Sequence, residues 1–477
     1  MRMDTVNQAA AGRPRRIVIV GGGYAGFYTA RKLEKYLRRS EAVVTVVDPL
    51  PYMTYQPFLP EVVAGSVEAR HAVVSLRRHL RRTHVVSGAA TSIDHANRTV
   101  RVHLIGGGET ALEYDEVVVT TGSITRTFPV PGIPDEAIGL KRIEEAVAIR
   151  DTMLTSLDIA ADLPSGPDRE RLLTVTVVGG GFAGVEGFGE LLGLARAVAR
   201  RRYGIARDEL RFHLVEAADR ILPEVTPEVS AWVTRKLRAK GAHVHLGTTA
   251  TSIYDSVVEL ASGESFESGL VIWATGITAT PVIANRTDLP TTARGFIEVR
   301  SDLQVGTEAG PVAGAWAAGD AAAVPDLVVG GTAVAPPNAQ HAVRQAKRLA
   351  KNITASLRGR RTRPYQHADL GVIATLGLGW GVFQSGPFLI KGFPAWLLHR
   401  AYHVMVIPTW ERKLRVLSVW LLAALLGRDI VSLRSVQQPG YGFRHEGQVW
   451  FPDARRQSVE AAVVETTAPV ESGIHGD

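Results

Sequence analysis

Cysteine is absent from this 477-residue sequence. Its absence excludes disulfide bonds, thiolate metal sites, iron–sulfur clusters and any redox step through a pair of thiols. Metal-ligand patterns are lacking as well, because the 14 histidines are scattered without an HExxH motif or a paired histidine–carboxylate cluster. We therefore predict no metal site.

Long apolar runs and targeting segments are also missing. Residues 1–16 are basic and polar, without the apolar run of a secretory signal. The most apolar stretch, 416–427, would be roughly 18 Å long as a helix, well short of the hydrocarbon core of roughly 30 Å. We expect no membrane-spanning helix, an ordered chain that begins near Arg15 and stays in the cytosol, and a flexible polar tail at 451–477.

Basic residues outnumber acidic ones and give a net charge of +7. Such an excess favours an anionic partner, which could be a nucleic acid, a lipid surface or a phosphorylated cofactor. The basic runs at 77–82, 196–202 and 358–363 are most simply solvated faces. Since no nucleic-acid-binding motif accompanies them, we predict no nucleic-acid partner.

A glycine-rich turn near the start of the chain indicates a dinucleotide site. In IVIVGGGYAGFYTARKL (17–33), a β-branched strand is followed by Gly21, Gly23 and Gly26 in GxGxxG spacing, and then by an amphipathic helix. Such glycines permit a tight turn and close approach to a pyrophosphate, which the helix N-terminus then faces. The next strand ends in Asp48, where a carboxylate can accept hydrogen bonds from ribose hydroxyls.

A second unit of the same design follows in TVTVVGGGFAGVEGFGEL (174–191). Its turn contains Gly179, Gly181 and Gly184, and the following strand ends in Glu216. A carboxylate at this place repels a 2′-phosphate and accepts a hydrogen bond from a free 2′-hydroxyl, which favours NADH over NADPH. Arg220 nearby weakens this argument, because an arginine can bind the 2′-phosphate.

Four later stretches complete the two sites. The segments at 112–123 and 266–278 each end a strand in a T-T-G or A-T-G turn. The segment at 312–326 is a strand that ends in Gly319–Asp320, and 336–353 opens a helix with proline at its start. The expected FAD contacts are Gly21, Gly22, Gly23, Ala25, Gly26, Asp48, Thr121, Gly122, Gly319, Asp320 and Ala339, and the expected NADH contacts are Gly179, Gly181, Phe182, Ala183, Gly184, Glu216, Thr275 and Gly276.

This set of motifs resembles the two-dinucleotide-binding flavoprotein reductases, over roughly residues 15–385. The resemblance implies an α/β fold with two Rossmann-like domains, in which the NADH domain is inserted in the FAD domain. We predict five segments: an FAD-binding domain, first part, at 15–150; an NADH-binding domain at 151–285; an FAD-binding domain, second part, at 286–385; a C-terminal membrane-anchoring region at 386–450; and the tail at 451–477.

The C-terminal segment at 388–434 combines aliphatic residues with tryptophans, a tyrosine and seven basic residues. Basic and aromatic flanks around a short apolar helix are typical of an anchor that lies in one leaflet of an anionic membrane. The alternative is a helix buried in the core or in a dimer interface, which leaves homodimerisation open. We favour the membrane interpretation because basic residues flank both ends.

With this segment, the chain resembles the type II NADH dehydrogenases, which are single-subunit NADH:quinone oxidoreductases of respiratory membranes. The similar stretches are PYMTYQPFLPEVVAGSVE (51–68), GVEGFGEL (184–191), VEAADRILPEVTPEVS (215–230) and PPNAQHA (336–342). The resemblance places Glu186 near the nicotinamide and flavin, and Gln340 at the quinone pocket. Many members have a second glutamine one helical turn after Gln340, where this chain has Arg344.

The resemblance implies oxidation of NADH through FAD with two-electron reduction of a membrane quinone, without proton pumping, at the cytoplasmic face of the cell membrane. Structural alternatives exist for the site residues. Glu186 could be a first-turn acid that complements a helix dipole, Glu190 is expected to be a solvated or helix-paired acid, and Gln340 could cap its helix. Two other functions stay open: a soluble diaphorase or flavin reductase with a C-terminal dimerisation helix, and a non-catalytic NADH-binding redox sensor.

Overall fold

A computed structural model describes residues 13–307, 309–368 and 371–433, so the predicted tail and the end of the predicted membrane-anchoring region lie outside the described residues. The chain divides into two units, Met1–Ile430 and Val431–Asp477. All helices and strands named below belong to the first unit. The described part of the second, 431–433, contains neither helix nor strand.

The first sheet is mixed and has a parallel centre, as the buried β-branched strands of the first glycine unit predict. The described strands lie in the order β20-β21-β8-β1-β2-β5-β6-β7, and β21, β8, β1, β2 and β5 run parallel. Their bounds are β1 (Arg15–Val20), β2 (Ala42–Asp48), β5 (His84–Asp94), β6 (Thr99–Leu104), β7 (Glu109–Glu113), β8 (Glu116–Val119), β20 (Gln304–Thr307) and β21 (Gly310–Ala317).

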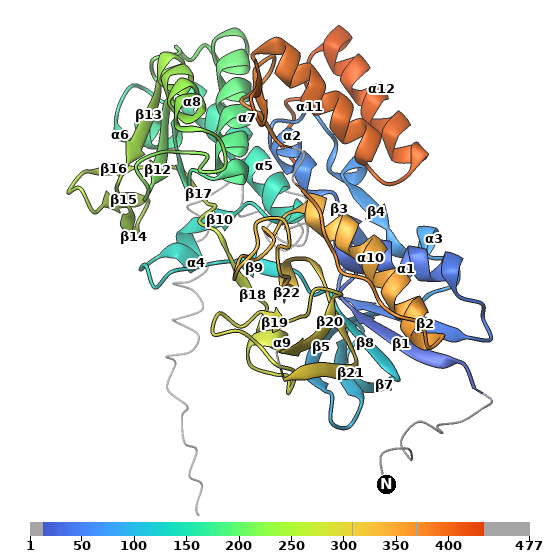
Figure 1. Ribbon diagram of the computed structural model, residues 1–477. Helices are drawn as coiled ribbons and strands as arrows, with labels where there is room; N and C mark the ends of the chain where they lie inside the picture. Colours follow the sequence, from blue (N-terminus) through green and yellow to red (C-terminus); the bar gives the residue numbers. More distant parts are fainter. Residues whose placement is uncertain (1–12, 308, 369–370, 434–477) are drawn as a thin grey trace, which may run out of the picture. The chain divides into compact units, whose positions relative to one another are not determined.

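Two helices pack side by side against this sheet, α1 (Tyr24–Tyr36) and α10 (Ala339–Leu357), although they are far apart in the sequence (Figure 1). Their small and aliphatic residues, such as Ala30, Leu33, Ala346 and Leu349, are buried. The pairing brings the start of α10 close to the first glycine turn. The late segment of the chain therefore completes the first dinucleotide-binding domain.

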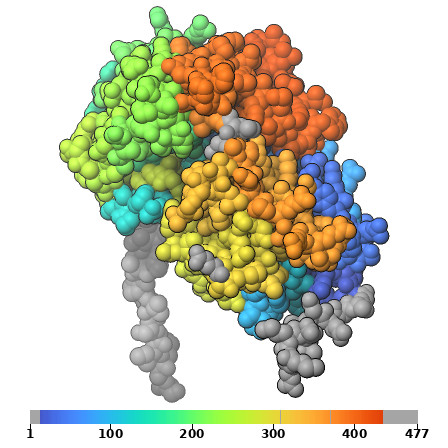
Figure 2. Space-filling model, in the orientation of Figure 1, coloured from blue at the N-terminus to red at the C-terminus, as the bar shows by residue number. Residues whose placement is uncertain are grey.

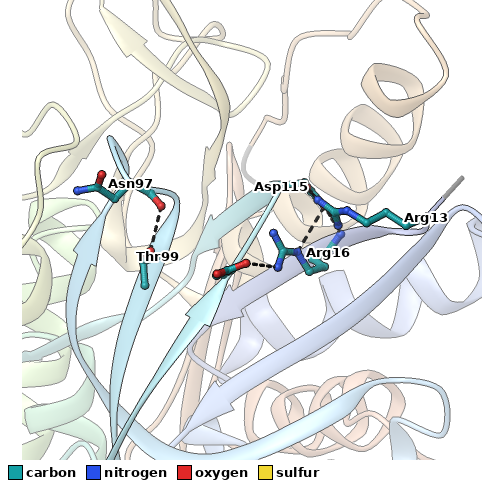
Figure 3. A network of polar contacts seen from close by, with 6 residues as sticks. Arg13, Arg16, Asn97, Thr99 and Asp115 are labelled. Atoms are coloured by element: carbon teal, nitrogen blue, oxygen red, sulfur yellow. Dashed lines mark hydrogen bonds and ion pairs between the residues drawn. The ribbon is translucent and has the colours of Figure 1, made fainter. Parts of the chain in front are cut away.

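A cluster of charges fixes the start of β1 (Figure 3). Arg13 donates two hydrogen bonds to the Asp115 carboxylate, at 2.9 and 2.8 Å, and the backbone N–H of Arg16 donates a third at 2.7 Å. Arg16 also pairs with Glu113 at 2.6 Å. On the neighbouring β5–β6 turn, Thr99 donates to the carbonyl oxygen of Asn97 at 3.0 Å. The first strand is thus attached to the turn before β8.

The second sheet is entirely parallel among the described strands, in the order β10-β17-β11-β12-β13. One of its strands, β10, lies within the range 15–150 that we predicted for the first domain, so the chain enters the second sheet before residue 151. The bounds are β10 (Ala137–Gly139), β11 (Thr174–Val178), β12 (Arg211–Glu216), β13 (Ala242–Leu246), β17 (Leu270–Trp273), α5 (Ile143–Asp162), α6 (Pro167–Leu172), α7 (Phe182–Val198) and α8 (Pro227–Ala239).

The chain passes between the two sheets twice, through β9 (Ser123–Thr125) and β18 (Ile277–Ala279). These strands pair antiparallel, with Ile124 opposite Thr278. The entry and exit of the inserted domain therefore lie next to each other. The small surrounding elements are β3 (Tyr52–Thr54), β4 (Val73–Ser75), α2 (Leu59–Val63), α3 (Leu76–His79), α4 (Ile133–Glu136), β14 (Ala250–Tyr254), β15 (Val257–Leu260), β16 (Ser265–Glu267), α9 (Pro281–Ala284), β19 (Ile297–Glu298) and β22 (Ala322–Ala323).

The C-terminal part of the first unit consists of a small antiparallel sheet and two helices. The elements are β23 (Val372–Thr375), β24 (Gly381–Ser385), β25 (Phe388–Lys391), α11 (Phe393–Val406) and α12 (Trp410–Leu426). The pairing of β24 with β25 crosses the boundary that we predicted at 385/386. Among the described helices, none has the length and apolar character to cross a membrane.

Candidate functional site

The first glycine turn has the geometry of a dinucleotide cradle. Gly21 has φ +103°, and a Cβ there would lie 2.3 Å from the Thr120 carbonyl oxygen, while a Cβ at Gly26 would lie 1.8 Å from the carbonyl oxygen of Gly21. Gly23 differs, because a Cβ there would meet nothing within 4 Å. The chain is therefore tightly packed behind the turn and open in front of it, where a pyrophosphate would lie.

The acid expected at the ribose lies beside this turn. Asp48 accepts hydrogen bonds from the backbone N–H of Gly22 at 2.6 Å and from that of Leu50 at 2.7 Å. Burial raises the pKa of Asp48, and the two N–H donors oppose that shift. Of the other residues predicted around this cradle, Ala25 lies in the first turn of α1, and Thr121 and Gly122 lie in the turn after β8.

The second turn repeats this arrangement. Gly179 has φ +116°, a Cβ at Gly184 would lie 1.9 Å from the carbonyl oxygen of Gly179, and a Cβ at Gly181 would meet nothing within 4 Å. Glu216 accepts from the backbone N–H of Gly180 at 2.5 Å and of Ala218 at 2.8 Å. Phe182 and Ala183 open α7, and Thr275 and Gly276 follow β17, so all predicted residues of this site surround one turn.

The guanidinium of Arg220 is engaged by its own loop and is not free to bind a 2′-phosphate. Its guanidinium donates to the carbonyl oxygens of Val225 and Pro223, both at 2.8 Å. These bonds hold the loop after β12. Glu216 is consequently the charged side chain that lies next to the second glycine turn.

Asp320 lies in the short 3-10 turn Gly319–Ala321 that follows β21, not in the strand itself, and the structure adds partners that the sequence did not reveal. Its carboxylate accepts from the Ser123 hydroxyl at 2.9 Å and lies 3.8 Å from Lys141 Nζ. Burial lowers the pKa of Lys141, while the Asp320 charge opposes that effect. The preceding residue, Gly319, donates its N–H to the Gln345 side chain at 2.7 Å. Lys141 comes from a segment without a motif, and Gln345 lies in the helix predicted at 336–353 but was not among the predicted site residues.

The start of α10 differs slightly from the prediction. The helix begins at Ala339, so the two prolines precede it instead of forming its first residues, and its N-cap is Asn338, whose side chain accepts from the His341 N–H at 2.8 Å. Since Asn338 provides the cap, Gln340 is not needed for that purpose. The Gln340 side-chain oxygen instead lies 3.1 Å from Nε2 of His367. Arg344 donates to the backbone carbonyl of Gln340 at 3.0 Å.

Glu186 lies beyond the first turn of α7, so it is not the first-turn acid of the alternative interpretation. It is buried, and its Oε1 accepts from the backbone N–H of Thr375 at 2.9 Å and lies 3.4 Å from Nε2 of His399. Its partners thus come from β23 and α11, which are remote in the sequence.

The expectation for Glu190 was wrong. This residue is neither solvated nor paired within its helix but fully buried. Its carboxylate accepts from the Thr375 hydroxyl at 2.9 Å and lies 3.7 Å from the Arg428 guanidinium. The residue has an i,i+4 spacing to Glu186, which places both side chains on the face of α7 that β23 covers. A sequence pattern alone could not show that this face is buried.

Many exposed apolar side chains gather on the C-terminal elements. In Figure 2 the residues of α11 and α12, in dark orange, form one continuous part of the visible surface. Within α12, Trp410 is 74% exposed and Leu426 is 81% exposed, and only Val416 is buried. The apolar surface consists of Phe388, Leu389, Ile390, Phe393, Leu397, Met405, Val406, Trp410, Leu414, Leu417, Leu421, Leu422, Leu425 and Leu426. A helix buried in this subunit's own core is therefore excluded for α12.

Comparisons with known proteins agree with this architecture. A profile described as pyridine nucleotide-disulphide oxidoreductase matches residues 15–346. The type II NADH:quinone oxidoreductase Ndh of Mycobacterium tuberculosis is 27% identical, over 87% of this chain and 89% of the relative. The demethylphylloquinone reductase NdbB of Synechocystis sp. is 29% identical, over 87% and 97% respectively. The solved structure of NDH2 from Plasmodium falciparum in complex with NADH, at 18% identity, has a TM-score of 0.80 and covers 88% of this chain and 100% of that one.

Proposed function

The chain belongs to the pyridine nucleotide-disulphide oxidoreductase family, and we propose that it is an NADH:quinone oxidoreductase that uses FAD and does not pump protons. The observation that carries this proposal is the pair of matching cradles, open at Gly23 and Gly181, each beside a carboxylate. Bound flavin would supply the redox chemistry, and the protein supplies orientation and exclusion of water. Because the chain has no cysteine, it has no disulfide of its own to accept electrons.

The direct test is to purify the yellow protein and follow NADH oxidation with and without a water-soluble quinone. We expect slow oxidation without quinone and a large acceleration with it. A redox sensor would instead show slow turnover with every quinone tried. The names of the two curated relatives described above support a quinone as the acceptor.

The nucleotide cradle favours NADH over NADPH. Glu216 offers a carboxylate where the adenosine ribose would lie, and Arg220 is engaged by the carbonyls of its own loop. A 2′-phosphate would therefore meet a negative charge without a free cation beside it.

We expect the Glu216→Gln variant to lose part of its preference for NADH. Glutamine keeps the size of the side chain but removes the repulsion, worth about 1–3 kcal/mol, so the ratio of kcat/KM for NADH to that for NADPH should fall by roughly five-fold or more. Steady-state kinetics with both nucleotides measure this ratio. A wild-type preference for NADPH would contradict the assignment.

Gln340 and Glu186 are proposed to serve opposite halves of the reaction. Gln340 begins the helix beside the first cradle, and its side chain faces His367, while Glu186 belongs to the helix of the second cradle. If the nicotinamide and the quinone approach from these two sides, each residue affects one substrate.

We expect Gln340→Ala to slow flavin reoxidation by quinone by about three- to ten-fold, the worth of one hydrogen bond, and to leave anaerobic reduction by NADH nearly intact. Glu186→Gln should chiefly disturb the NADH half-reaction. Stopped-flow absorbance at the flavin band measures the halves separately. Equal losses in both halves for Gln340→Ala, with unchanged flavin content, would mean that Gln340 only holds the cofactor.

The apolar surface of β25, α11 and α12 is proposed to lie on the membrane as a peripheral, monotopic anchor at the cytoplasmic face. Lys391, Lys413 and Arg415 lie among or beside its apolar residues and suit an anionic leaflet. The same surface could instead pair with a second copy of the chain, which would give a soluble dimer.

A further inference from the structure

A single buried imidazole lies between carboxylates from two different helices. His399 of α11 points its Nε2 at Glu186 of α7, with 3.4 Å to Oε1, and its Nδ1 at Glu61 of α2, with 3.7 Å to Oε1. All three residues are buried, with His399 and Glu61 each only 1% exposed. Glu61 and His399 belong to no motif and were not predicted from the sequence.

Other charged groups surround this row of three side chains. On α7, Glu190 lies 3.7 Å from the Arg428 guanidinium. On α11, Arg400 is stacked between two tryptophan rings, 4.4 Å from each centroid. The titratable and charged groups facing the cluster from the elements packed around it are thus Glu61, Glu186, Glu190, His399, Arg400, His403, Arg428, Tyr55 and, near Glu190, Lys240.

The second imidazole of α11 has a different role. His403 lies one helical turn after His399, but its Nδ1 is 3.0 Å from the Tyr55 hydroxyl rather than from a carboxylate. Burial and the neighbouring His399 hold the pKa of His403 well below its ordinary value. Burial thus disfavours the cationic form of His403, whereas His399 is the imidazole of this pair that faces a carboxylate on each side.

The protonation states follow from burial and charge together. Burial alone would lower the pKa of His399, but its hydrogen bond to Glu186 and the charge of Glu61 raise it above its ordinary value. Burial raises the pKa of Glu61 to about 7, although the charge of His399 opposes that shift. Glu186 also accepts a hydrogen bond from the backbone N–H of Thr375. Within the described residues, the Glu61 carboxyl accepts no such backbone hydrogen bond. With its pKa raised to about 7, Glu61 takes up a proton near neutral pH.

We propose that His399 is a positioning residue that holds the Glu186 carboxylate at the NADH cradle as an ion pair with its Nε2–H, with Glu61 on the other side of the imidazole ring. This inference rests on the proposed function, because it assigns the supporting residues of that same site. Hydride departure leaves a positive charge on the nicotinamide ring, so a fixed carboxylate nearby stabilises that charge as it develops. A protonated Glu186 would lose this effect.

Infrared spectroscopy of the flavin-loaded protein without substrate tests the charge assignment. We expect a protonated-carboxyl band to grow as the pH falls from 8 to 6, and Glu61→Gln to remove it. In the His399→Gln variant we expect a second protonated-carboxyl band near neutral pH. The double variant His399→Gln/Glu186→Gln should lack this second band. A wild-type band that survives Glu61→Gln, or a spectrum unchanged by His399→Gln, would overturn the proposal.

The kinetic counterpart is the pH profile of flavin reduction by NADH. His399→Gln should move the acidic limb upward by about one pH unit or more, a loss of rate of about two-fold where the wild-type rate first becomes flat and approaching ten-fold below the wild-type limb. The matched control is His403→Gln, which also replaces a buried imidazole of α11 and should keep the wild-type profile. His399→Lys, which restores a cation, should move the limb back.

The outcomes separate this inference from the proposed function. If wild-type protein does not pass electrons from NADH to quinone, the proposed function fails, whereas the infrared spectra still report on the cluster. If quinone reduction is observed but both His399→Gln and His403→Gln shift the profile equally, the effect is one of packing and the positioning role is wrong. If His399→Gln does not fold, the Glu61→Gln spectrum decides alone.

Discussion

Gly23→Val is expected to yield a folded protein without flavin. Gly23 has φ −66° and ψ −158°, a negative φ at the edge of the extended region that other residues can adopt, and a Cβ there would meet no protein atom within 4 Å. The substitution therefore causes no clash within the protein itself. The added methyl groups point into the open space of the cradle, where they would displace the pyrophosphate. We expect the flavin content to fall at least ten-fold and quinone reduction to be lost with it.

The second cradle supplies the matched control. Gly181 has φ −72° and ψ −179°, and a Cβ there also meets nothing within 4 Å. Gly181→Val should therefore keep its yellow colour while its KM for NADH rises at least ten-fold. Flavin absorbance and circular dichroism of both variants make the comparison. Stoichiometric flavin in folded Gly23→Val would contradict the assignment of the first cradle.

Replacing Leu417, Leu421 and Leu425 together by Asp should release the protein from membranes. The three side chains follow one another at i,i+4 spacing along α12, and they are 48, 62 and 72% exposed. Burying each in lipid is worth about 1.5 kcal/mol or more, so losing all three lowers the membrane affinity by more than a hundred-fold. Sedimentation with anionic vesicles measures the bound fraction.

An equally apolar and exposed stretch elsewhere provides the control for this triple variant. Leu327, Val328 and Val329 are 41, 48 and 75% exposed and lie in a turn of the loop after β22. Their replacement by Asp changes the charge by the same amount and should leave membrane binding intact. High salt should release the wild-type protein only in part, because apolar burial survives screening. Wild-type protein that stays in solution as a dimer and becomes a monomer in the α12 variant would favour the dimerisation alternative.

Local sequence patterns predicted the two glycine turns and their carboxylates. The partners of Glu186 and Glu190 depend on long-range packing and were not predicted. Gly21, Gly26 and Asp48 lie within one strand–turn–helix–strand unit, so their spacing alone specifies the turn. The family profile confirms the two-dinucleotide architecture. The assignments of individual residues to FAD, NADH and quinone stay predictions.

The cluster around Glu186 could not be predicted because its members come from three distant parts of the chain. Glu190 illustrates the difficulty, since an acid in a helix is normally solvated, and only the packing of β23 and α11 on α7 buries it. The His399–His403 pair at i,i+4 spacing was visible in the sequence. Without its partners, however, the pair could equally have faced solvent.

The insertion of one domain in another has a consequence for how the chain folds during synthesis. Strand β8 needs β21 as its neighbour, yet β21 emerges from the ribosome only after the whole second sheet has been made. Until then one edge of the first sheet is unpaired, which is a site of misassembly. The β9–β18 pairing limits this exposure, because once the inserted domain has folded it holds the two ends of a very long loop together. We therefore expect the inserted domain to fold first and, through the β9–β18 pairing, to bring the two parts of the flavin-binding domain together.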